Sequence, residues 1–253
     1  MSGVVSLLRD LLFPPRCIGC AERMSPCTEK KGDPYFCASC AKKWENDQLA
    51  QCPDCYAAYC DCRCIPTVMT RAGVKEWIKL APYHGDRGTS VTDCVVRGMK
   101  KEPRRRSFEC CARSLKPLLL SALEKAKEEV PVSHTVIGYL PRAREKVRRY
   151  GFDQARELAA VLAKETGLPF SAVLRRVKDG VPQKSLGVQK RRENLRGAFA
   201  LCRDVKGKRV ILVDDLVTTG AGMAEAARVL RQGGAGEVWC VSVAATPKKV
   251  SIK

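Results

Sequence analysis

The part of the chain after residue 73 contains short, uninterrupted apolar runs bounded by charged or turn-forming residues. Three of them, at residues 134–141, 208–215 and 237–246, have the length and composition of buried β-strands. A shorter run at 171–177 is a further strand candidate. The apolar pattern therefore predicts a sheet built from well-separated segments of this half of the chain.

Between these runs lie stretches that carry apolar residues at helical spacing. Residues 152–168 and 222–235 each predict one helix, and glycines end the second of them. Residues 90–130 predict two helices that are separated near Pro103. Strands that alternate with helices are typical of a parallel sheet with crossover helices. We therefore predict an α/β domain, in which a parallel sheet is flanked by helices.

The beginning of the chain follows a different pattern, in which cysteines take the place of apolar runs. Ten of the fifteen cysteines lie between Cys17 and Cys64. A chain of 253 residues is long enough for one good-sized domain and a small one. Because the composition changes near residues 66–73, we expect a Cys-rich domain at 1–68 and the α/β domain at 69–253.

The cysteines of this head come mainly in C-x-x-C pairs, on a chain without a recognisable export signal. In a reducing compartment such pairs indicate metal binding rather than disulfides. A tight turn points both thiolates of a pair at one ion, and two pairs complete a tetrahedron around zinc. We predict two structural zinc ions, the first held by Cys17, Cys20, Cys37 and Cys40 and the second by Cys52, Cys55, Cys60 and Cys64.

The last two ligands of the second site are open at this stage. Cys60, Cys62 and Cys64 offer three thiols for two places, and we favour Cys60 with Cys64. Cys27 is expected to be a spare thiol. Sets of four cysteines also hold iron–sulfur clusters, which is the alternative to zinc.

The charge balance is the unusual feature of the composition. Lys and Arg number 46 against 27 Asp and Glu, which gives a net charge of +19. Such a surplus attracts phosphate groups, on a nucleic acid or on a small polyphosphate. The basic residues gather within 97–106, 142–149 and 175–196. No apolar run is long enough for a membrane span, and residues 1–17 lack the features of a signal peptide, so we expect a cytoplasmic protein.

The strand expected at 208–215 ends in two adjacent carboxylates, Asp214 and Asp215, and continues through a Thr-Thr-Gly-Ala-Gly loop into a helix. In open α/β sheets, ligands bind beyond the carboxyl ends of the strands. The start of a helix offers backbone N–H groups and a positive dipole end to a phosphate. Carboxylates suit sugar hydroxyls, or the water around a magnesium ion. The stretch therefore predicts a site for a ribose 5-phosphate compound.

Residues 210–222, VILVDDLVTTGAG, resemble the thirteen-residue phosphoribosyl-pyrophosphate (PRPP) motif of type I phosphoribosyltransferases. A Cys-rich double zinc ribbon ahead of such a domain resembles the ComF family, also described as ComFC/GntX-like or amidophosphoribosyltransferase-like. Residues 139–159 are similar to a second element of that family. A third element is carried by Gln183, Arg191, Asn194, Ala198 and Phe199.

The resemblance implies transfer of a phosphoribosyl group from PRPP, with Mg²⁺ as cofactor, to an acceptor that the sequence does not name. It implies that Asp214 and Asp215 are the catalytic residues and act on the ribose hydroxyls. The implied substrate-binding residues are Val217, Thr218, Thr219, Gly220, Ala221 and Gly222 for the 5-phosphate, with Arg142 and Arg144 for the pyrophosphate.

The chain departs from the family pattern at three positions. Tyr150 stands where arginine is usual before Gly-Phe, and Asp153 stands where asparagine is usual. Gly222 stands where the loop commonly ends in threonine or serine. Losing that hydroxyl removes one phosphate donor and leaves the backbone N–H in place.

The ComF family is associated with natural transformation, so the resemblance also implies a role in DNA uptake. The alternative function is therefore a non-catalytic accessory protein that binds single-stranded DNA, works with a competence helicase and keeps a sensory or relic PRPP site. The dense basic groups favour this alternative. A regulator that senses PRPP is a third interpretation, disfavoured because the sequence has no recognisable DNA-reading helix pair.

Overall fold

The computed structural model describes residues 14–24, 33–85, 90–101, 105–126, 130–178 and 195–247. Its main sheet has four strands, all parallel to their neighbours. In spatial order these are β1 (Val74–Pro82), β6 (Glu237–Ala245), β5 (Arg209–Val217) and β2 (Thr135–Tyr139). A parallel sheet places the carboxyl ends of its strands along one edge, which is where ligands of this architecture bind.

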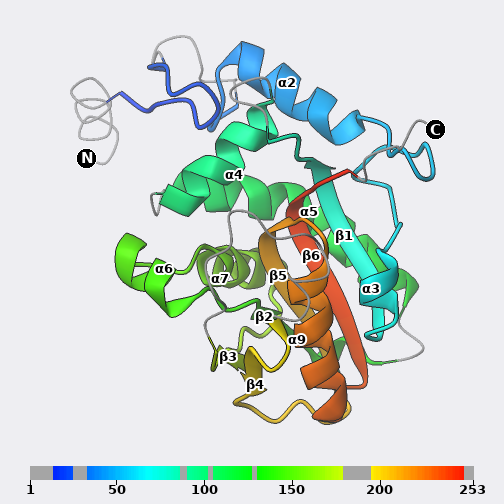
Figure 1. Ribbon diagram of the computed structural model, residues 1–253. Coiled ribbons are helices and arrows are strands. Elements are labelled where there is room, and N and C mark those ends of the chain that lie inside the picture. The colour runs from blue at the N-terminus through cyan, green and yellow to red at the C-terminus, as the bar shows by residue number, and fades with distance from the viewer. Residues whose placement is uncertain are drawn as a thin grey trace, which may run out of the picture.

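The helices surround this sheet (Figure 1). In chain order they are α2 (Ala38–Leu49), α3 (Thr67–Thr70), α4 (Val91–Lys101), α5 (Arg105–Lys125), η1 (Val132–His134), α6 (Arg144–Tyr150), α7 (Gln154–Thr166) and α9 (Ala221–Gln232). The predicted fold class is confirmed: a parallel sheet is flanked by helices and preceded by a Cys-rich segment.

The run at 171–177 adds no strand to the main sheet, although the N–H of Ser171 donates to Ile137 O of β2 at 2.9 Å. Only Leu174–Arg176 (β3) is a strand, and it pairs antiparallel with β4 (Phe199–Leu201). The apolar pattern alone could not place β3, because a three-residue strand gains its hydrogen bonds from a partner far along the chain. The helices α2 and α6 were not predicted either.

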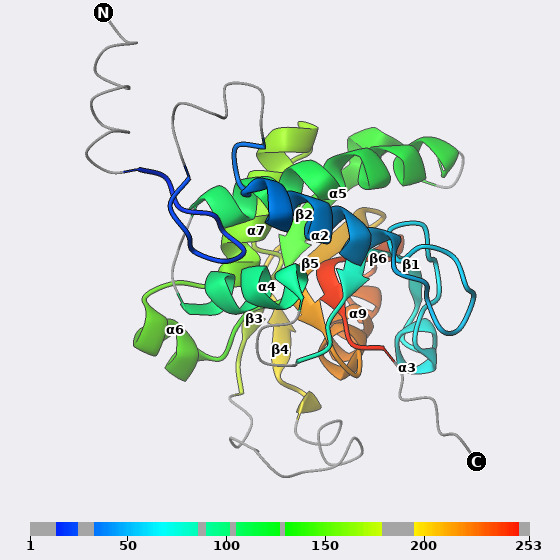
Figure 2. The same cartoon turned by 90° about the horizontal axis from the view of Figure 1, so that it is seen from above.

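Apolar residues fill both faces of the sheet. On one face Ile211 and Val213 of β5 pack with α4, α5 and α7. On the other face Val210 and Leu212 pack with α3 and α9. Figures 1 and 2 show α9 on the side of the sheet opposite α5 and α7. Alternate residues of β5 therefore face two different cores, as they must in a strand that is buried on both sides.

The Cys-rich segment packs directly on the α/β part. Trp44 of α2 and Phe36 just before it belong to the same apolar cluster as Val95 of α4 and Phe108 of α5. Figure 2 shows α2 lying across this helical layer. The predicted boundary at 68/69 stays a prediction, because both apolar clusters contain residues from each side of it. In the part of the chain that the structure describes, no helix combines the length and apolarity needed to cross a membrane.

The half-buried carboxylate of Asp47 joins the Cys-rich segment to the α/β part. Oδ2 of Asp47 on α2 accepts hydrogen bonds from Ser90 Oγ at 2.8 Å, from the backbone N–H of Thr92 at 3.0 Å and from Thr92 Oγ1 at 2.9 Å. Asp47 thus supplies an acceptor to the first turn of α4, whose backbone N–H groups have no partner within the helix.

Removing this acceptor is expected to destabilise the fold. In Asp47→Ala the N–H of Thr92 loses its partner, which lowers the free energy of unfolding by about 1–3 kcal/mol. Urea unfolding followed by circular dichroism measures the change. Glu45→Ala, an exposed carboxylate on the same helix, is the matched control. Equal stability of the two variants would contradict this role.

Candidate functional site

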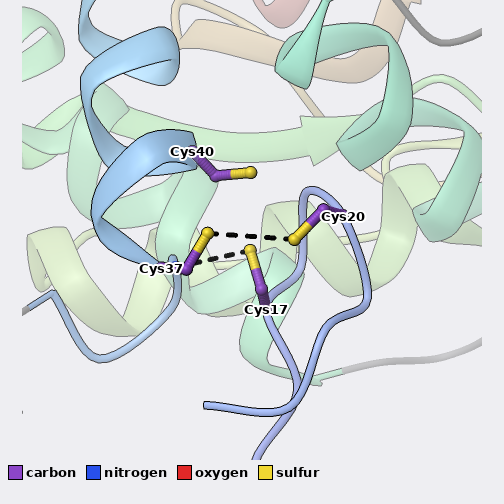
Figure 3. Close-up of side chains that lie close together, drawn as sticks. All are labelled: Cys17, Cys20, Cys37 and Cys40. Carbon is purple, nitrogen blue, oxygen red and sulfur yellow. Dashed lines mark hydrogen bonds between the residues drawn. The ribbon is translucent and has the colours of Figure 1, made fainter. Parts of the chain in front are cut away.

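The first cysteine cluster forms where a loop meets the start of α2 (Figure 3). The sulfur atoms of Cys17, Cys20, Cys37 and Cys40 all lie within 4.8 Å of one another. The Sγ atoms of Cys20 and Cys37 are 3.8 Å apart. Figure 3 shows the four side chains converging from the two segments. This is the set that the C-x-x-C spacing predicts.

The surroundings of Cys17 fit a bound cation. Its Sγ accepts backbone N–H groups from Gly19 and Cys37, both at 3.4 Å. Burial raises the pKa of the Cys17 thiol, but the N–H groups of Cys20, Cys37 and Gly19 outweigh it and bring this pKa to about 7. A Cβ at Gly19 would lie 3.0 Å from Cys40 Sγ, so a side chain at that position would press on a ligand.

The second cluster repeats the geometry of the first. In each knuckle the residue after the second cysteine has a positive φ, 64° at Ala21 and 60° at Tyr56. Each is closed by an isolated antiparallel bridge between flanking residues, Arg16 with Arg23 and Gln51 with Ala58. The four sulfur atoms that lie within 4.8 Å of one another here are those of Cys52, Cys55, Cys62 and Cys64.

The structure thus brings Cys62, and not the favoured Cys60, to the second cluster. Cys60 lies in a turn, in which the N–H of Cys62 donates to Ala58 O at 2.8 Å. The chain is irregular and without further turns from Cys62 to Pro66, so Cys62 and Cys64, two residues apart, reach one side together. Cys62 is fully buried. We therefore replace Cys60 by Cys62 in the proposed ligand set.

A buried lysine anchors this second cluster to the sheet. Lys79 of β1 is 2% exposed, and its Nζ donates to Cys62 O at 2.9 Å and to Cys64 O at 3.1 Å. The ammonium also lies 4.3 Å from the centre of the Trp77 ring. Both four-cysteine clusters can hold zinc, whose structural sites are closed tetrahedra of this kind.

The loop between β5 and α9 contains the predicted anion-binding residues. Gly220 has a φ of +75° and directly precedes α9, where a Cβ would lie 2.7 Å from Met69 Sδ. A side chain at Gly220 would therefore be strained by the positive φ, and Met69 would have to move to make room for it. The N–H of Ala221 points to Thr219 Oγ1 at 3.4 Å. The first turn of α9 carries no acidic residue, which leaves its positive dipole end to an anion.

The two aspartates occupy the end of β5 at the approach to this loop. Asp215 is 2% exposed, and its carboxylate lies 3.2 Å from Lys100 Nζ and 3.3 Å from Gln154 Nε2. Asp214 Oδ1 accepts the backbone N–H of Asp215 at 2.9 Å. Burial, followed by the neighbouring Asp215, raises the pKa of Asp214 well above its ordinary value, while Lys100 acts in the opposite direction.

Lys100 and Gln154 were not singled out from the sequence. Lys100 belongs to the basic group at 97–106, for which the sequence suggests phosphate or DNA binding, and it reaches Asp215 only because α4 packs beside β5. Gln154 falls in the family element at 139–159, which is the signal that could have found it.

Arg142 lies in the turn after β2, where its side chain and its backbone N–H contact nearby residues. The guanidinium lies 4.7 Å from the Tyr150 ring and donates to Lys100 O at 3.3 Å. The carboxylate of Asp153 accepts the N–H of Arg142 at 2.8 Å and caps α7 by accepting the N–H groups of Ala155 and Arg156. The two departures Tyr150 and Asp153 are thus both used to fix this turn. Arg144 opens α6 and donates to Arg176 O at 3.4 Å.

Other predicted residues lie outside the described part of the chain. These are Cys27, Gln183, Arg191 and Asn194. Ala198 and Phe199 are described and buried.

Comparison with known families agrees with the geometry of this site. Residues 147–251 match the family described as phosphoribosyl transferase domain. The matched stretch includes β5, the loop and α9. This part of the chain is therefore similar to a phosphoribosyl transferase domain.

Two named bacterial proteins are similar to stretches of the chain longer than this domain. The chain is 28% identical over 211 residues to DNA utilization protein YhgH of Salmonella typhimurium, a match that covers 81% of this chain and 89% of the relative. It is 32% identical over 132 residues to Competence protein F of Haemophilus influenzae, covering 50% and 57% respectively. These matches confirm the predicted resemblance to the ComF family.

Solved phosphoribosyltransferases are more distant. A hypoxanthine phosphoribosyltransferase from Staphylococcus aureus has a TM-score of 0.35 and 13% identity, over 59% of this chain and 70% of that one.

The ligand set of the second cluster can be tested by metal content. We expect two zinc ions per chain in the unmodified protein and in Cys60→Ser, and one in Cys62→Ser, because three thiolates hold zinc less firmly than four. Elemental analysis after gel filtration measures this. Loss of zinc from Cys60→Ser with retention in Cys62→Ser would restore the original assignment.

The raised pKa of Asp214 predicts a pH dependence of stability. Above the ordinary value of 3.8, the unfolded carboxyl loses its proton before the folded one does, so stability falls as pH rises towards the folded pKa. Asp214→Asn removes this loss and is therefore expected to gain stability relative to the unmodified protein, by a larger margin at pH 8 than at pH 5. Urea unfolding at both pH values measures it, and equal curves would contradict the raised pKa.

Proposed function

We propose that the protein binds PRPP with Mg²⁺ and transfers its phosphoribosyl group to an acceptor. The observation that carries the proposal is the position of Asp214 and Asp215 beside the β5–α9 loop, inside the matched phosphoribosyl transferase domain. One half of this site suits a phosphate and the other half suits sugar hydroxyls. PRPP contains both groups.

The loop is the proposed seat of the 5-phosphate. Backbone N–H groups from Thr218 to Gly222 and the hydroxyls of Thr218 and Thr219 donate to it, and Val217 and Ala221 set the ends of the loop. The conformation of Gly220 supports this, because the chain bends back at that residue and α9 begins directly after it.

The two aspartates are proposed to accept hydrogen bonds from the ribose hydroxyls. Asp215 is held by Lys100 and Gln154, so its carboxylate is oriented before ligand binds. Mg²⁺, when bound with PRPP, would neutralise pyrophosphate charge, and acidic side chains and their water are ligands it accepts. Arg142 and Arg144 are the proposed cations for the pyrophosphate.

In the proposed reaction the bond between ribose C1 and the pyrophosphate oxygen breaks, and its electron pair leaves with pyrophosphate. A lone pair of the acceptor forms the new bond to C1, and the acceptor proton passes to pyrophosphate or water. Positioning and charge stabilisation supply most of the rate in such a step. The side chains named here bind and orient the donor. The nature of the acceptor determines which group receives its proton.

Calorimetric titration with PRPP and Mg²⁺ tests the proposal. We expect binding by the zinc-loaded protein, weaker binding of ribose 5-phosphate, and at least a tenfold loss in the Asp214→Asn, Asp215→Asn double variant, because both carboxylates would lose their negative charge. Asp204→Asn, an exposed aspartate elsewhere on the chain, is the control and should bind as the unmodified protein does. A folded protein that does not bind PRPP would contradict the assignment of this site to PRPP.

A second candidate function is binding of single-stranded DNA, as the names of the relatives and the net charge of +19 favour. The basic residues are not all available for it. Arg106 donates to the carbonyls of Arg16 and Pro34, and thereby ties the Cys-rich segment to α5. Exposed basic side chains lie along α6, among them Lys146 and Arg148.

Salt dependence distinguishes this candidate. Reversing two charges in Lys146→Glu, Arg148→Glu is expected to weaken binding of a labelled oligothymidylate. The negative slope of log affinity against log salt concentration should become shallower by about 1.4, since each phosphate contact to a single strand contributes about 0.7. Lys42→Glu, Lys43→Glu on α2 is the matched control. The same slope for both variants would argue against α6 as a DNA contact.

A further inference from the structure

Lys79 is a charged side chain buried in an apolar strand. All residues of β1 from Trp77 to Pro82 are buried, and Lys79 among them is 2% exposed. No carboxylate of the described residues forms an ion pair with it. Its ammonium donates to Cys62 O at 2.9 Å and to Cys64 O at 3.1 Å, and lies 4.3 Å from the centre of the Trp77 ring. Carbonyls and a ring face carry only partial charges, and a buried charge is costly unless an opposite charge offsets it. Lys79 therefore needs a counter-charge from a neighbouring group.

The second cysteine cluster can supply that counter-charge. Both carbonyls that bind the ammonium belong to cysteines of the cluster, so Lys79 lies directly against it. Figures 1 and 2 show the segment between α2 and α3, which holds the cluster, beside β1. Four thiolates around one zinc ion carry a net negative charge, because they outnumber the two positive charges of the ion. A zinc-loaded cluster and a buried ammonium would each offset the charge of the other.

The first cluster offsets its charge in another way. Cys17 Sγ accepts two backbone N–H groups, from Gly19 and Cys37. Arg106 binds two carbonyls near this cluster, but these belong to residues outside the ligand set, and its side chain is only half-buried. In the described residues around the first cluster, no buried ammonium contacts a ligand.

The second cluster does not share those hydrogen bonds. The bonds of the described residues include none from a backbone N–H to one of its four sulfur atoms, and Cys55 Sγ contacts Cys62 Sγ instead at 3.5 Å. The one basic residue between the cysteines of this cluster is Arg63, whose guanidinium pairs with Glu76 at 3.2 Å. Lys79 is therefore the cation that the fold brings to the ligands of this cluster.

From this contact we propose that Lys79 is the counter-ion of the second cluster when zinc is bound there. Its ammonium offsets the charge of the zinc-bound thiolates from the side of the two ligand carbonyls. Zinc binding and the packing of that cluster on β1 then stabilise each other. Zinc binding at the first cluster does not depend on this lysine, and neither does PRPP binding.

The space beside Lys79 permits a comparison of charge with hydrogen bonding at this one position. Lys79 lines a cavity of about 570 Å³ between the second cluster and the β5–α9 loop, together with Cys64, Trp77 and the loop residues Thr218 and Thr219. A longer side chain can extend into this space, which avoids the strain of overpacking.

Transfer of zinc from the whole chain to an excess of the chromogenic chelator pyridylazoresorcinol tests the proposal. Lys79→Met keeps the length of the side chain and removes its charge. It is expected to speed release from the second cluster by about 10–100-fold and to leave release from the first unchanged. Cys62→Ser, which is expected to retain one zinc ion, identifies the phase of the first cluster. Lys75→Met removes an exposed lysine of the same strand, and as the matched control it should release both ions at the unmodified rates.

Two further variants separate charge from hydrogen bonding. Lys79→Arg keeps the charge and should release zinc at close to the unmodified rate. Lys79→Gln keeps an N–H donor without the charge and should release zinc as fast as Lys79→Met. If Lys79→Gln restores slow release, or if Lys79→Arg releases as fast as Lys79→Gln, charge is not the cause and the proposal is overturned. This comparison decides the question even if Lys79→Met does not fold.

The first cluster serves as the internal reference in every sample. Unchanged release from the second cluster in Lys79→Met overturns the proposal, because the charge would then have no effect on zinc. Equal acceleration at both clusters also overturns it, because the lysine would then act on the fold as a whole.

Discussion

The parallel pairing of β5 with β6 and β2 is the constraint on which the binding surfaces of this protein depend. Asp214 is paired in register with Ser242 of β6, and Val213 with Tyr139 of β2. Because the three strands run the same way, the loop after β5, the Arg142 turn after β2 and the residues after β6 emerge at one edge. Antiparallel pairing would send neighbouring loops to opposite edges. The candidate donor site and the cavity both follow from this single arrangement.

The cost of burying charge shapes the site at that edge. Two adjacent carboxylates are partly removed from water, and the fold offsets this with one ammonium, that of Lys100, and one amide, that of Gln154. Burial and the neighbouring Asp215 still raise the pKa of Asp214 well above its ordinary value, against the opposing effect of Lys100. Such a site gains from a ligand that brings further cations or hydrogen-bond donors. A sugar hydroxyl is a donor of that kind, and a magnesium–pyrophosphate group brings the cation.

The Cys-rich segment is part of the binding edge and not only an appendage. Lys79 holds the carbonyls of Cys62 and Cys64 against β1, and Asp47 of α2 holds the first turn of α4, the helix that carries Lys100. Metal in the two clusters would therefore stabilise elements that also shape the site. Removal of the metal is expected to change the conformation of the β5–α9 loop. Both the cavity wall and the contact between Asp47 and α4 depend on the folded Cys-rich segment.

The sequence by itself determined the features that depend on local spacing. The C-x-x-C pairs predicted six of the proposed thiolate ligands. The apolar runs predicted β2, β5 and β6 of the four-stranded sheet, together with the loop and the helix that follow β5, but not the edge strand β1. These patterns are local because a knuckle, a buried strand and a phosphate loop each use residues that are close along the chain. The tertiary structure alone decided which of Cys60, Cys62 and Cys64 complete the second cluster, since that depends on the turn at residues 58–62. It alone decided that Lys100 reaches Asp215, and that residues 52–66 and 218–219 enclose one cavity, because these contacts join segments that only packing brings together.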